Sequence, residues 1–138
     1  MILLNQKPKD FLKKQGKLDE ALHHYTKAIK LNKNDGESYY KAAGVLASQG
    51  KHKQAIQYYN EAIARFTKQL GSDPNPSGIK DLLGMSYVGL GKVLLNQGNV
   101  QEASNLFSKA SRVSPRLKKQ FKQNPPVSGK LSPLWKRN

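Results

Sequence analysis

Histidine and acidic side chains are the residues with which this chain could perform acid–base or metal chemistry. The three histidines are His23, His24 and His52. His23 and His24 are consecutive, so on a helix their rings point in different directions and cannot chelate one ion together. The nine acidic residues are scattered, and no pair is placed for general acid–base work. We therefore expect solvent-exposed histidines, no enzymatic activity, no catalytic residues, and no cofactor or metal site.

The segment Gly89-Leu90-Gly91-Lys92 has the glycine and lysine content of a phosphate-binding loop. A Walker motif would need Gly at position 86 and Ser or Thr at position 93, where this chain has Ser86 and Val93. The segment also lies inside a helical pattern rather than after a strand. The sequence therefore argues against a nucleotide site.

Composition limits the architecture and the compartment. The 138 residues suit one domain, and a hydrophobic content of 37 % suits an elongated stack of helices better than a sphere. The chain has no Cys, which excludes disulfides and thiolate metal sites and fits a reducing compartment. The first apolar run, Met1–Leu4, is shorter than the roughly 7–15 residues of a secretory signal, and no stretch approaches the ~20 apolar residues of a membrane span. A soluble, cytoplasmic protein is therefore expected.

An internal repeat organises most of the chain. Three segments beginning at Gln15, Gln49 and Gln97 align without gaps on the pattern Q-G-[KN]-x-x-[EQ]-A-x-x-x-[YF]-x-[KE]-A. The glycine is predicted to end one helix in each copy, because only Gly adopts the left-handed C′ conformation without cost. The small and aromatic positions then share one face of the next helix. They are Ala21, Tyr25 and Ala28; Ala55, Tyr59 and Ala62; and Ala103, Phe107 and Ala110.

Each unit is thus predicted to be helix–turn–helix, and the residue types and the 34-residue spacing from Gly16 to Gly50 resemble the tetratricopeptide repeat (TPR). The consensus positions of that family fall on Tyr87, Leu90-Gly91, Ala103, Phe107, Ala110 and Pro115. The resemblance covers roughly residues 9–115. It implies an all-α fold, a right-handed α-solenoid of antiparallel helix pairs with about three units.

The predicted repeat domain spans residues 1–115, with units at about 1–34, 35–70 and 79–115. The first unit is degenerate: Pro8 restricts its opening helix to about residues 8–15. Either this unit is an N-terminal cap or an upstream part has been lost, and the sequence leaves both open.

The 48-residue spacing from Gly50 to Gly98 contains a 14-residue insertion. A continuous helical stripe over residues 52–70, a turn over 71–78 and a new helix from Ile79 predict that the insertion lengthens two adjacent antiparallel helices. The alternative is a disordered loop between helices of standard length. Gly84, Gly89 and Gly91 lie within the second of these helices, where close packing is the expected reason for them.

The end of the chain differs in charge from the repeats. Net charge is +15, and residues 115–138 contain seven basic residues and no acidic ones. Residues 116–123 are a candidate capping helix, with Leu117 and Phe121 as its apolar face. Residues 124–138 are expected to be a basic flexible tail that includes Trp135.

In the TPR family the first helix of each repeat lines the concave side of the stack. The groove-facing positions implied by that resemblance are Gln6, Lys7, Asp10, Lys13, Lys14, Glu37, Tyr40, Lys41, Gly44, Ser48, Met85, Val88, Gly89, Lys92 and Asn96. Our candidate partner-binding residues are Lys13, Tyr40, Lys41, Lys92 and Asn96. The set of basic and Asn residues with which some TPR domains clamp chaperone C-termini is missing. The resemblance therefore implies a scaffold or adaptor that binds a protein or peptide segment, expected to be acidic, in its groove.

Two other kinds of partner remain open. The +15 charge would also suit nucleic acid or an anionic surface, bound through the basic ends of the chain. Against this, no ordered aromatic–basic stripe is present. Self-association is the third possibility, because three repeats are about the minimum for a stable stack and one is degraded here.

Overall fold

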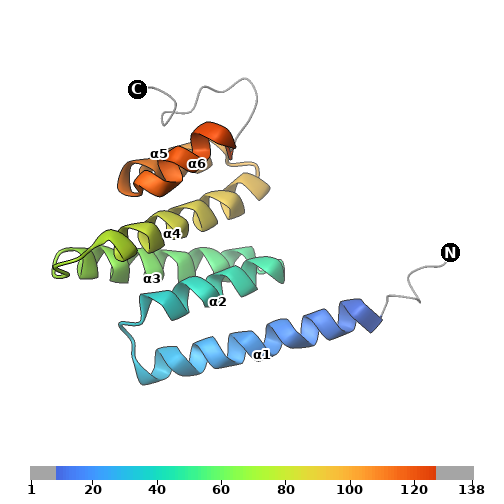
Figure 1. Ribbon diagram of the computed structural model, residues 1–138. Coiled ribbons are helices and arrows are strands. Elements are labelled where there is room, and N and C mark those ends of the chain that lie inside the picture. Colours follow the sequence, from blue (N-terminus) through green and yellow to red (C-terminus); the bar gives the residue numbers. More distant parts are fainter. Residues whose placement is uncertain (1–8, 127–138) are drawn as a thin grey trace.

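Six consecutive helices account for most of the chain in the computed structural model, which describes residues 9–126. They are α1 (Lys9–Leu31), α2 (Gly36–Ser48), α3 (His52–Leu70), α4 (Ser77–Asn96), α5 (Val100–Val113) and α6 (Pro115–Gln123). Each helix lies against the next, so the molecule is a stack ordered as the sequence is (Figure 1). The predicted all-α helical repeat fold is confirmed. Within residues 9–126, no helix has the length and apolar content needed to cross a bilayer.

Two glycine turns form the helix pairs α2–α3 and α4–α5. Gly50 and Gly98 have φ angles of 78° and 86°, in the left-handed region that glycine tolerates. In the first turn the Gly50 and Lys51 amides donate to the carbonyls of Ala47 and Leu46, at 3.0 and 2.9 Å. These bonds satisfy carbonyls that the end of α2 would otherwise leave unpaired. The second and third copies of the repeat are therefore helix–turn–helix units, as the pattern predicts.

The first copy is different, and the predicted helix end at Gly16 is wrong. α1 runs without a break for 23 residues through this glycine, instead of stopping at about residue 15. The repeat register explains why a short helix does not fold back here. It places Lys9 where α2 has Ala43, a residue with no exposed surface. Folding back would bring the lysine to a core position, whereas a glycine inside a helix costs only about 1 kcal/mol.

The insertion lengthens two helices, as predicted. α3 has 19 residues and α4 has 20, and they pack together along the stack. Residues 71–76 join them, with the Asn75 amide donating to Asp73 Oδ1 at 2.8 Å. α4 begins at Ser77, two residues before the predicted start at Ile79.

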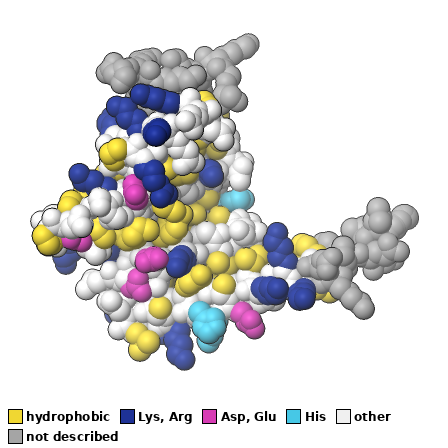
Figure 2. All heavy atoms as spheres, viewed as in Figure 1, with side chains coloured by type: hydrophobic (Ala, Val, Ile, Leu, Met, Phe, Trp, Pro, Cys, Tyr) yellow, Lys and Arg dark blue, Asp and Glu magenta, His cyan; other side chains and the backbone are white. Residues whose placement is uncertain are grey.

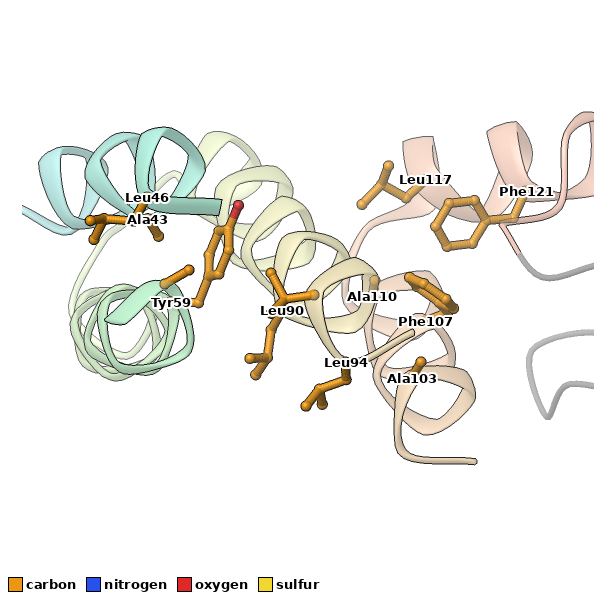
Figure 3. Close-up of a cluster of buried hydrophobic side chains, with 12 residues drawn as sticks. Ala43, Leu46, Tyr59, Leu90, Leu94, Ala103, Phe107, Ala110, Leu117 and Phe121 are labelled. Atoms are coloured by element: carbon orange, nitrogen blue, oxygen red, sulfur yellow. The ribbon is translucent and has the colours of Figure 1, made fainter. Parts of the chain in front are cut away.

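The core lies between successive helix pairs and is built from the small–aromatic–small faces. Ala103, Phe107 and Ala110 have no exposed surface, and the equivalent residues of α3 are at most 6 % exposed. Figure 3 shows Tyr59 between α2 and α4, and Phe107 facing Phe121 of α6. Gly91 confirms the expectation of close packing, because a Cβ at this position would stand 2.7 Å from Phe107 Cε1.

α6 lies against α5 and α4 at the C-terminal end of the stack. Its residues Leu117 and Phe121 are buried, and the Phe121 and Phe107 ring centroids are 6.4 Å apart. Ser114 caps the helix: its Oγ accepts from the Leu117 amide at 3.2 Å and donates to Asp81 Oδ1 of α4 at 2.6 Å. α6 is thus fixed to the preceding repeat through both its cap and its apolar face. Residues 127–138, with Trp135 and most of the expected tail, lie outside the described residues.

Candidate functional site

A pocket of about 460 Å³ opens where α2, α4 and α6 come together over α3. We call it the α2–α4–α6 groove. Its wall combines apolar, aromatic, amide and cationic side chains with the two prolines that follow α6. The lining residues are Tyr40, Tyr59, Met85, Val88, Gly89, Lys92, Arg116, Leu117, Gln120, Phe121, Asn124, Pro125 and Pro126.

Gly89 brings two tyrosines together at the bottom of this groove. A Cβ on Gly89 would collide with the Tyr59 ring, with Cζ at 2.5 Å and Oη at 2.7 Å, so only glycine lets the ring lie against α4. The ring centroids of Tyr40 and Tyr59 are 6.0 Å apart with an interplanar angle of 59°. Such a tilted pair is a favourable aromatic arrangement. Gly84 also meets the expectation of close packing, since Leu117 Cδ1 lies 2.7 Å from its Cβ position.

Both tyrosine hydroxyls are protonated at neutral pH. Burial raises the pKa of Tyr40 above its ordinary value. Burial, and to a smaller extent the charge on Tyr40, raises the pKa of Tyr59 to about 12. A protonated phenol can donate a hydrogen bond as well as accept one. The groove therefore offers neutral donors beside its apolar surface.

The charges at the groove are of one sign. Lys92 of α4 and Arg116 of α6 line it, and no acidic residue is among its lining side chains. The ion pairs found within residues 9–126 involve other residues, Lys41 with Glu37 and Arg65 with Glu61. Gln120 and Asn124 add amide groups on the α6 side. The arrangement suits an occupant that has apolar side chains together with carboxylates or backbone carbonyls.

The structure brings together some of the residues selected from the sequence and separates the others. Tyr40 and Lys92 line the groove, along with Met85, Val88 and Gly89 from the wider set. Lys41 is exposed and pairs with Glu37 at 3.2 Å, and a hydrogen bond to Glu37 raises the pKa of Lys41. Lys13 and Asn96 are exposed on α1 and α4, outside the groove lining. Gln6 and Lys7 lie outside the described residues.

Sequence reasoning missed the α6 side of the groove and Tyr59. Arg116, Gln120 and Asn124 recur every four residues, next to the apolar pair that was assigned to capping. That spacing was the available signal, because it places the three side chains along one line of a helix. Tyr59 was assigned to the core alone, although its ring both packs in the core and lines the groove.

The histidines form no cluster. His23 and His24 are exposed as expected, whereas His52 is half-buried, so the expected exposure is wrong for this residue. Within residues 9–126, no group of three or more His, Asp or Glu side chains is placed to hold a metal ion.

Models of a known protein family match the helices described above. Family models described as tetratricopeptide repeat match residues 12–69 and residues 86–117. The first match runs from α1 to α3, and the second from α4 into α6. Both glycine turns described above lie within a matched range.

Two kinds of curated relatives are similar to this chain. The Photosystem I assembly protein Ycf3 of Prochlorococcus marinus (strain NATL2A) is 31 % identical over 101 residues, which cover 71 % of this chain and 54 % of the relative. The BBSome complex member BBS4 of Xenopus tropicalis is 28 % identical over 124 residues, covering 75 % of this chain and 24 % of the relative. The chain thus spans about half the length of the Ycf3 relative and about a quarter of BBS4.

Proposed function

Because the chain belongs to the tetratricopeptide repeat family, we propose that it is a non-enzymatic module that holds a segment of another protein in the α2–α4–α6 groove. The observation that carries this proposal is the chemistry of the groove. It pairs an apolar surface and two protonated tyrosines with cations from two helices, and its lining contains no acidic residue. A protein segment with apolar and acidic side chains fits these properties.

The names of the relatives support a scaffold role. One is described as an assembly protein and the other as a member of a complex, and both descriptions imply binding to other proteins. By analogy we propose that this chain acts as a scaffold or adaptor in the assembly of a protein complex. We keep the cytoplasm as its proposed location, which the absence of cysteine from the sequence supports.

The recognition elements have separate roles in this proposal. Tyr40, Val88 and Phe121 supply the surface against which an apolar side chain of the partner is buried. The tyrosine hydroxyls and the amides of Gln120 and Asn124 bond to the partner's backbone, as strand-like or helical segments require. Lys92 and Arg116 set the preference for an acidic segment.

Reversing the groove charges is expected to abolish this preference. A peptide selected against the wild-type chain from a random display library should lose at least about tenfold in affinity, or 1.4 kcal/mol, in the double variant Lys92→Glu/Arg116→Glu. Attraction between the cations and the partner's carboxylates then becomes repulsion. Isothermal titration calorimetry measures the change.

The matched control is Lys27→Glu/Lys68→Glu, which changes net charge equally at two exposed positions outside the groove lining. Its affinity should stay within about twofold, a difference of roughly 0.4 kcal/mol. Equal losses in the two double variants would mean that net charge alone governs binding, and the assignment of the groove would be wrong.

One observation favours a second candidate, binding to nucleic acid or an anionic surface. Outside the groove lining, α5 and α6 expose five cations on a surface that we call the outer side of α5 and α6, and no acidic residue occurs between positions 103 and 126; the cations are Lys109, Arg112, Lys118, Lys119 and Lys122. A phosphate ligand bound there would lose affinity steeply with salt. The loss would follow replacement of Lys118 and Lys119 rather than Lys92, which separates this candidate from the groove.

A further inference from the structure

The exposed lysines of α6 lie on the side of the helix that points away from the groove. Arg116, Gln120 and Asn124 line the groove and form one row along α6, with four residues between successive members. Lys118 and Lys122 form a second row, displaced by two residues from the first. Two residues correspond to a rotation of about 200° around an α-helix, so the two rows point in nearly opposite directions. α6 therefore presents one face to the groove and a basic face to solvent.

Positive charge gathers over this end of the stack, as Figure 2 shows. Lys119 is exposed next to the lysine row, and Lys109 and Arg112 are exposed on α5. No acidic residue follows Glu102 in the sequence, so no nearby carboxylate of the same segment offsets these charges. We propose that the outer side of α5 and α6 binds a lipid bilayer with anionic headgroups, while the groove stays open to its protein partner.

Charge complementarity carries this proposal. Four of the five cations on the outer side are lysines, and lysine is a compact, hydrated point charge. Such charges suit diffuse attraction to many headgroups better than bidentate recognition of a single phosphate. Clusters of about four to eight Lys and Arg on a helical surface are typical of binding to anionic lipid. Lipid binding here rests on the second candidate function, which it narrows to a bilayer, and it is independent of peptide binding in the groove.

The sequence that follows α6 favours a bilayer over nucleic acid. It contains Leu131, Leu134 and Trp135 between the cations Lys130 and Lys136. Apolar side chains strengthen the attachment of a basic protein by entering the membrane interface, where tryptophan is enriched. A nucleic acid attracts the same cations and can stack on an aromatic ring. The two leucines add to binding chiefly on a bilayer, so they distinguish the two ligands.

Binding to vesicles tests the proposal, and Trp135 reports it because it is the only tryptophan of the chain. Vesicles of equal parts phosphatidylserine and phosphatidylcholine are compared with vesicles of phosphatidylcholine alone. We expect cosedimentation of the full chain, and a shift of the indole emission to shorter wavelength, with the anionic vesicles only. Each cation near such a surface contributes about fivefold in affinity, so Lys118→Gln/Lys119→Gln/Lys122→Gln should weaken binding at least about 30-fold. A wild-type chain that does not bind the anionic vesicles would overturn the proposal.

The matched control is Lys27→Gln/Lys53→Gln/Lys68→Gln, which removes the same charge at exposed positions of α1 and α3. Its vesicle affinity should stay within about threefold, because charges far from the bound surface are screened by salt. Equal losses in the two triple variants would mean that net charge alone governs binding, and would overturn the assignment of the surface. Circular dichroism checks that both variants fold. Binding of the groove peptide is measured separately, so failure of the lipid surface is told apart from failure of the groove.

The variant Leu131→Ala/Leu134→Ala separates a bilayer from nucleic acid. Its affinity for the anionic vesicles should fall at least about fivefold, since apolar surface is lost from the membrane interface. Its affinity for a random-sequence DNA duplex should equal that of the wild type. Tighter binding of the wild-type chain to this duplex than to the vesicles, with no effect of the leucine variant on vesicle binding, would assign the surface to nucleic acid and overturn the proposal.

Discussion

Replacing Phe107 by alanine is expected to lower the free energy of unfolding by about 3–5 kcal/mol. The side chain has no exposed surface and projects from α5 against two other helices of the stack, α4 and α6. Its ring faces Phe121 of α6 and lies where a Cβ on Gly91 of α4 would stand. Because these neighbours belong to separate helices fixed by other contacts, the cavity left by the ring cannot close fully. Urea unfolding followed by circular dichroism measures the loss.

The control for Phe107→Ala is Leu106→Ala on the same helix. Leu106 is half-buried at the edge of the same cluster, so its loss should be smaller, about 1–2 kcal/mol. A Phe107→Ala variant that loses no more than the Leu106→Ala variant would mean that α4, α5 and α6 are not packed around this ring.

Replacing Gly89 by alanine is expected to destabilise the chain and to deform the groove together. The added Cβ would meet the Tyr59 ring, which also packs against the Tyr40 ring. Overpacking of this kind typically costs about 1–3 kcal/mol, more than the roughly 1 kcal/mol that alanine gains over glycine in helix propensity. Thermal unfolding measures the stability, and the aromatic NMR signals of Tyr40 and Tyr59 report the movement of the rings.

Gly78→Ala is the matched control, because it makes the same substitution in the same helix. Nothing lies within 4 Å of a Cβ at Gly78, so this variant should be as stable as the wild type or up to about 1 kcal/mol more stable. If Gly89→Ala behaved in the same way, Tyr59 would not be held against α4, and the proposed bottom of the groove would be incorrect.

The repeat pattern predicts the central part of the fold well because each of its positions has a local physical role. Two features of the pattern, the left-handed glycine turn and the buried Ala–aromatic–Ala face, depend only on contacts within and between the helices α2, α3, α4 and α5. Gly16 shows where this reasoning fails. Gln15-Gly16-Lys17 equals Gln49-Gly50-Lys51, and we attribute the different structure to Lys9, seven residues away, which takes the register of the buried Ala43. Local sequence does not reveal which long-range contacts are missing.

The groove could also be predicted only in part: the sequence indicates its lining residues from α2 and α4, but not those from α6. The resemblance to the tetratricopeptide repeat implies that Tyr40, Met85, Val88 and Lys92 face the groove, and all four residues line it. The contribution of α6 depends on how the last helix lies against α4. That position follows from the Ser114–Asp81 hydrogen bond and from the space above Gly84, which are contacts between distant residues. The spacing of residues within α6 does not predict these contacts.

The central claim is that a protein segment binds in the α2–α4–α6 groove, and mapping a bound peptide by NMR tests it most directly. An acidic peptide selected on the wild-type chain is added to the ¹⁵N- and methyl-labelled chain. We expect the largest shift changes at Met85, Val88 and Gln120, and loss of binding in Val88→Arg but not in Thr67→Arg, an exposed residue of α3 outside the groove. Shift changes confined to the outer side of α5 and α6, with binding unchanged in Val88→Arg, would contradict the claim.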